Sequence, residues 1–150
     1  MVTPRAHATR SPLQLAALIV GIVFLLVGIL GFIPGITANT GDLELAGPGS
    51  DAMLLGIFEV SILHNVVHLL FGVAGIALSR TWAGARNFLI GGGIVYLLLF
   101  LYGLLVPHGS AANFVPFNSA DNWLHLVLGL GMVALGALLG RSRGRTRSVL

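Results

Sequence analysis

Cysteine and lysine are absent from this sequence of 150 residues, and charged side chains of either sign are scarce. Without cysteine, the chain forms no disulfide, offers no thiolate metal ligand and has no cysteine nucleophile. Only 9% of the residues are charged and 56% are hydrophobic, whereas about a quarter of the residues of a soluble domain are charged. These deficits argue against a soluble domain and indicate a membrane protein.

Familiar catalytic motifs are missing as well. The sequence contains no phosphate-binding loop, no serine nucleophile arrangement and no pair of catalytic carboxylates. It therefore favours a non-enzymatic protein, although it does not decide the point.

The positive charge comes entirely from arginines, which lie in three groups beside long apolar runs. They are Arg5 and Arg10, then Arg80 and Arg86, then Arg141, Arg143, Arg145 and Arg147. Basic groups in such places are typical topology signals of membrane proteins, so we expect no nucleic acid partner.

Four apolar segments are expected to form helices that cross a bilayer, at residues 13–34, 54–79, 88–106 and 121–140. At about 1.5 Å per residue, about twenty helical residues span a hydrocarbon core of about 30 Å. All three arginine groups would then lie on one side of the membrane, and the positive-inside tendency makes that side cytoplasmic. We therefore predict a cytoplasmic arm (residues 1–12), a transmembrane domain (residues 13–140) and a basic cytoplasmic tail (residues 141–150).

The second and fourth predicted helices look like one helix used twice. Their matched residues are Asn65 with Asn122, His68 with His125, and Gly72 with Gly129. The first and third helices match through GIVFLL at residues 21–26 and GIVYLL at residues 93–98. The predicted fold is thus an all-α membrane protein, a bundle of four transmembrane helices built from two parallel repeats of a helical hairpin.

Polar residues inside these apolar helices predict a shared cluster. Polar groups within a membrane normally face the interior of a bundle, and small residues such as Gly72, Gly75 and Gly129 let helices approach closely. We therefore expect the polar faces of the second and fourth helices to meet in the outer half of the bundle. The expected members of this cluster are His64, Asn65, His68, Asp121, Asn122 and His125.

Longer stretches of the chain carry a family resemblance. The segments SPLQLAALIVGIVFLLVGILGFIPG, SILHNVVHLLFGVAGIALSR and SAANFVPFNSADNWLHLVLGLGMVALG resemble domain-of-unknown-function family 4383, small integral membrane proteins found mostly in actinobacteria. The resemblance covers residues 11–140. It implies a four-helix protein of the bacterial plasma membrane, and it implies no activity.

Three interpretations of the cluster stay open. In the favoured one, a structural, partner-binding or envelope-associated protein needs these residues only to fix which helix faces meet, and its partners are the lipid bilayer, a second copy or another membrane protein. In the second, His64, His68, His125 and Asp121 bind a divalent metal, or His68 and His125 are axial ligands of a haem. In the third, a small transporter or proton-relay subunit uses the same groups.

Overall fold

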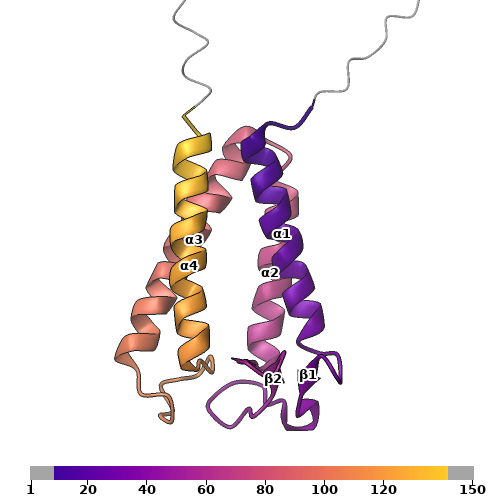
Figure 1. The fold of residues 1–150 in the computed structure, drawn as a ribbon, viewed down its shortest axis with the longest axis vertical. Coiled ribbons are helices and arrows are strands. Elements are labelled where there is room, and N and C mark those ends of the chain that lie inside the picture. The colour runs from indigo at the N-terminus through magenta and orange to yellow at the C-terminus, as the bar shows by residue number, and fades with distance from the viewer. Residues whose placement is uncertain (1–8, 142–150) are drawn as a thin grey trace, which may run out of the picture.

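The computed structural model describes residues 9–141, which form a bundle of four helices closed at one end by a small sheet (Figure 1). The helices are α1 (Pro12–Leu30), α2 (Ile62–Leu78), α3 (Trp82–Leu105) and α4 (Ser119–Leu139). Helices α1, α3 and α4 are long and apolar enough to cross a membrane, whereas α2, with 17 residues, is shorter. The chain is therefore a helical membrane protein.

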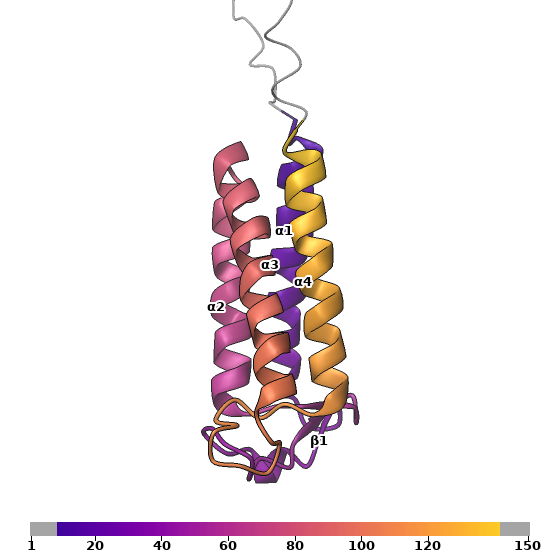
Figure 2. The same ribbon diagram turned by 90° about the vertical axis from the view of Figure 1, so that its left-hand side faces the viewer.

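The helices pack as two antiparallel pairs, α1 with α2 and α3 with α4 (Figures 1 and 2). Glycines bring the backbones of each pair together. A Cβ atom on Gly21 would lie 3.1 Å from the carbonyl oxygen of Gly72, and one on Gly93 would lie 2.8 Å from that of Gly129. These distances leave no room for a larger side chain, so the helix pairing depends on glycine at these positions.

The end of the bundle opposite the described chain ends carries a cap, which we define as residues 31–61 and 106–118. Its antiparallel sheet contains β1 (Thr37–Ala38), β2 (Met53–Leu54) and β3 (Phe58–Glu59), and a 3-10 turn lies at Thr40–Asp42. The sheet covers a small apolar core of Ala52, Leu54 and Val60.

Two hydrogen bonds join the two loops of the cap. The Gly47 N–H donates to the Phe114 carbonyl at 2.7 Å, and the Asn118 side chain donates to the Ile57 carbonyl at 2.7 Å. The outer loops therefore form one layer over the helix ends.

The second helix was predicted to begin near residue 54, but it begins at Ile62, and the cap explains the difference. Leu55 and Gly56 have φ values of 55° and 70°, which a right-handed helix does not accept, and strands β2 and β3 flank this turn. Ser61 then accepts a hydrogen bond from the His64 N–H at 3.1 Å and starts the helix as its N-cap.

Two other helix boundaries also differ from the prediction. The third helix begins six residues earlier, at Trp82, because the Thr81 hydroxyl accepts the Gly84 N–H at 3.0 Å and caps it there. The first helix was predicted to end at residue 34, but it ends at Leu30. The Thr37 hydroxyl donates a hydrogen bond to the Leu30 carbonyl at 2.9 Å. Most of the predicted arm (residues 1–8) and tail (residues 142–150) lies outside the described residues.

Candidate functional site

All six residues of the predicted polar cluster are buried, none more than 9% exposed. Within this buried region they make three kinds of contact. The histidines gather around Tyr96 of α3, each asparagine packs against a glycine, and Asp121 faces the cap.

The histidine group has a defined hydrogen-bond polarity. The rings of His64 and His68 stack with centroids 4.3 Å apart and planes 4° apart. Nδ1 of His68 lies 2.9 Å from the His64 carbonyl oxygen, and because a carbonyl only accepts, this nitrogen carries the proton. Nε2 of His68 is then an acceptor, and it faces the Tyr96 hydroxyl at 3.3 Å.

Tyr96 is the central residue of this site, and we did not include it among the predicted site residues. Its ring lies 5.3 Å from the His125 ring and stacks on Phe24 of α1 at 5.2 Å. A tyrosine in an apolar helix is usually interpreted as a packing residue or as a residue at the membrane interface, so it did not indicate a site. The one available signal was that it is the only difference between GIVFLL and GIVYLL.

Two cavities lie on either side of these rings. One of about 210 Å³, the histidine cavity, is lined by side chains from α2, α3, α4 and the loop before α4. The other, of about 100 Å³, is lined by side chains from all four helices and from the β2–β3 hairpin, and Asp121 is one of its lining residues. Four polar side chains line both cavities and separate them within an otherwise apolar interior: His64, His68, Tyr96 and His125.

The two asparagines are helix-packing residues in this structure. A Cβ on Gly31 of the cap would collide with the Asn65 side chain, and one on Gly103 of α3 would collide with that of Asn122. The glycines predicted for packing act in the same manner within each helix pair: Gly72 and Gly75 face α1, and Gly129 faces α3. The sequence predicted that the polar faces of α2 and α4 meet. In the structure each of these helices packs mainly on its hairpin partner, and the histidines of α2 and α4 line the same two cavities.

Asp121 connects helix α4 to the cap. Its carboxylate accepts the N–H groups of Glu59 at 3.0 Å and Asn118 at 3.1 Å, and the Asn118 side chain accepts the Asp121 N–H in return. This reciprocal pair is a capping box. The carboxylate thus holds β3 against the start of α4.

The predicted metal ligands do not fit one site. Among the residues that the structure describes, no group of three or more histidine, aspartate or glutamate side chains is placed to hold a metal ion. Both nitrogens of His68 have partners, and Asp121 serves backbone amides. His68 and His125, the residues predicted as axial haem ligands, both have the Tyr96 ring as a neighbour.

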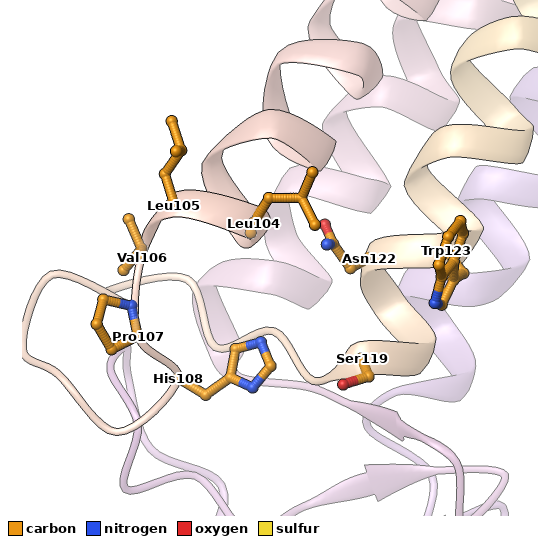
Figure 3. Close-up of a pocket in the computed structure, with 9 residues that line it drawn as sticks. Leu104, Leu105, Val106, Pro107, His108, Ser119, Asn122 and Trp123 are labelled. Carbon is orange, nitrogen blue, oxygen red and sulfur yellow. The ribbon is translucent and has the colours of Figure 1, made fainter.

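A third cavity lies farther out, between the end of α3 and the start of α4 (Figure 3). It measures about 410 Å³, and its polar lining residues are His108, Ser119 and Asn122. Asn122 points between the two helices beside Leu104, whereas His108 belongs to the outer loop (Figure 3). None of the histidine group lines this cavity, so it is separate from the site around Tyr96.

Fold and site together define a small helical membrane protein with a buried histidine and tyrosine group and with no metal-binding arrangement among its described residues. The chain belongs to the family described as Domain of unknown function (DUF4383), whose model matches residues 14–138. Comparisons with curated proteins and with solved structures find no match.

Proposed function

We propose that the protein crosses the bacterial plasma membrane four times, with both ends in the cytoplasm. The arginines of the described residues support this topology: Arg10, Arg80, Arg86 and Arg141 all lie at the bundle end opposite the cap (Figure 1). The acidic residues Asp42, Glu44, Asp51 and Glu59 belong to the cap. Helix α2, although short, runs alongside α1 and spans with it as a hairpin.

We infer further that the two hairpins are repeats of one unit. Residues at matched positions make the same contacts in each hairpin: Gly31 with Asn65 and Gly103 with Asn122, and Leu25 with Gly72 and Leu97 with Gly129. The N-caps of α2 and α4, Ser61 and Asn118, also occupy matched positions. Such agreement of contacts is a stronger argument for a repeat than agreement of aliphatic letters.

Within this scaffold the protein acts as a non-enzymatic binding protein for a small lipid-soluble molecule, held in the histidine cavity. The observation that carries this proposal is the lining of the cavity. Apolar side chains such as Val67, Phe71 and Leu99 form its walls, and His64, Tyr96 and His125 converge on it from three helices. A mostly apolar cavity with a few convergent polar groups is typical of a ligand site.

A purely structural role explains the histidines less well. Nδ1 of His64 and Nδ1 of His125 are buried without a hydrogen-bond partner. An unpaired buried polar group costs about 1–3 kcal/mol. Asn65 and Asn122 also carry unpaired atoms, but they pack against glycines, whereas the rings of His64 and His125 line a cavity with room for a ligand.

To test this proposal, a larger side chain is introduced into the cavity wall, and the loss of a bound molecule is measured. Val67→Phe adds a ring at the cavity wall, whereas Val66→Phe adds the same ring to the neighbouring residue, which is similarly exposed and does not line the cavity. Each protein is purified in mild detergent, and lipophilic molecules are extracted and quantified by mass spectrometry. We expect one compound near stoichiometry in the wild type and in Val66→Phe, and its loss in Val67→Phe. Wild-type protein without such a compound would refute the proposal.

A further inference from the structure

The histidine cavity continues into an apolar groove between α2 and α3. This groove measures about 540 Å³ and shares Phe71 and Val95 with the cavity. Gly91 also lines it, and no atom of another residue lies within 4 Å of the place where its Cβ would be. A compact cavity with polar groups that opens into a longer apolar groove fits a lipid with a small head and an extended apolar tail.

Charge restricts the head group of that lipid. No arginine lines the cavity, and the arginines of the described residues lie at the far end of the bundle (Figure 1). A phosphate or carboxylate head would be buried there without a permanently charged cation beside it, which is costly in an apolar interior. The head is therefore neutral.

Hydrogen-bond geometry restricts it further. The Tyr96 hydroxyl lies 3.3 Å from Nε2 of His68, beyond the ordinary range of about 2.7–3.2 Å. Turning this hydroxyl towards a ligand oxygen therefore gives up only a long hydrogen bond. His125 on α4 provides a second polar position beside the Tyr96 ring. Two positions on different helices fit a head with two separated oxygen atoms.

Aromatic rings form much of the cavity wall. Phe117 packs edge-on against His125 at 4.6 Å, and Phe71 packs edge-on against Tyr96 at 5.9 Å. Both phenylalanines line the cavity. Rings set at steep angles to one another favour a flat aromatic guest, which packs by stacking and by edge contacts.

We propose that the ligand is a prenylated quinone or quinol, with its ring oxygens at Tyr96 and His125 and its tail in the groove between α2 and α3; this inference rests on the proposed binding function.

The first test uses three probes with wild-type protein in nanodiscs of dioleoyl phosphatidylcholine. They are a 1,4-naphthoquinone with a short prenyl tail, a naphthalene with the same tail and no ring oxygens, and oleic acid. Isothermal titration calorimetry should show the quinone binding about a hundredfold more tightly than the naphthalene, the equivalent of two hydrogen bonds of about 1.4 kcal/mol each, one at Tyr96 and one at His125. Equal binding of these two, or tighter binding of oleic acid, overturns the quinone assignment and leaves the binding function standing. Failure of every probe, together with an empty wild-type extract, refutes both.

Tyrosine variants test the head position in the same assay. Tyr96→Phe should weaken quinone binding about tenfold and leave naphthalene binding unchanged, since only the hydroxyl is removed. Tyr102→Phe is the matched control, because the Tyr102 hydroxyl donates to the Ala112 carbonyl in the outer loop, away from the cavity. An equal effect of the two substitutions, or none for Tyr96→Phe, contradicts the assignment.

Glycine variants test the tail position. Gly91→Phe adds a ring at the groove from a position where a Cβ has open space, and Gly131→Phe adds the same ring to an equally open position on α4. A fourth probe is 1,4-naphthoquinone without a tail. Gly91→Phe should weaken binding of the prenylated quinone at least fivefold and leave binding of the tail-less quinone unchanged, and Gly131→Phe should change neither affinity. If Gly91→Phe and Gly131→Phe bind the prenylated quinone with equal affinity, the tail does not lie in the groove.

Discussion

The rings of Phe24 and Tyr96 stack at the centre of the bundle, with centroids 5.2 Å apart and planes 14° apart. Each ring also contacts the histidine of its own helix pair: Phe24 lies 5.7 Å from His68, and Tyr96 lies 5.3 Å from His125. The two helix pairs therefore meet through aromatic rings. Since only Tyr96 carries a hydroxyl, this pair also gives the site its asymmetry.

Glycine substitutions test the asparagine packing. Gly31→Ala and Gly103→Ala force a methyl group into Asn65 and Asn122 respectively, so each should lower the free energy of unfolding by about 1–3 kcal/mol. Gly131→Ala, at a position with open space, is the control. Thermal unfolding in detergent checks this. Unchanged melting of both variants would show that the asparagines yield readily and do not fix the helix pairing.

Asp121 variants test the connection between cap and bundle. Asp121→Ala removes the acceptor for two backbone N–H groups and should cost about 1–3 kcal/mol. Asp121→Asn keeps a side-chain oxygen and should retain most of the stability. Hydrogen exchange followed at the Glu59 amide is the most direct measurement, because that amide should exchange faster in Asp121→Ala alone. Equal exchange in all three proteins would place the support of the cap elsewhere.

Glu59 predicts a pH dependence of stability. Burial raises the pKa of its carboxyl, and the nearby Asp51 carboxylate adds to the effect. The folded protein thus binds this proton more tightly than the unfolded chain, so the contribution to stability is present below the ordinary glutamate pKa of about 4.3 and is lost as pH rises through the raised value. Glu59→Gln should flatten the part of the melting profile that lies above the ordinary glutamate pKa of about 4.3. A profile identical to that of the wild type would contradict this account.

The absence of native cysteine makes topology directly measurable. Gly109→Cys places a thiol in the exposed loop of the cap, and Ala83→Cys places one at the exposed start of α3, at the opposite end of the bundle. A membrane-impermeant maleimide should label Gly109→Cys in intact cells and Ala83→Cys only after permeabilisation. The reverse pattern would invert the proposed orientation.

Spectroscopy and elemental analysis test the metal and haem interpretations. Because His68 and Asp121 already have partners and Tyr96 fills the centre, the purified protein should show no haem absorbance, oxidised or reduced, and no stoichiometric metal. Haem absorbance or bound metal that disappears in His68→Ala and His125→Ala would restore the cofactor interpretation.

The polar cluster was predicted from the sequence only in part. Burial of His64, His68 and His125 followed from their position in apolar segments, because a polar group in such a helix turns away from lipid. The hydrogen-bond partners of the cluster residues could not be predicted from their positions in the sequence. Helical spacing places Asp121 on the same face as His125, but the carboxylate bonds to Glu59, far away in the chain. Hydrogen bonds of that kind depend on tertiary contacts that no spacing rule contains.

The sequence by itself determined the membrane class, the presence of four helices and the family, because long uncharged apolar runs and local motifs are properties of contiguous residues. Only the tertiary structure decided that residues 53–59 form strands, that Tyr96 stands among the histidines, and that a cavity between α2 and α3 opens into a groove. The physical reason is that strand pairing, ring contacts and empty space arise between segments distant in the chain, and their energies depend on how those segments pack.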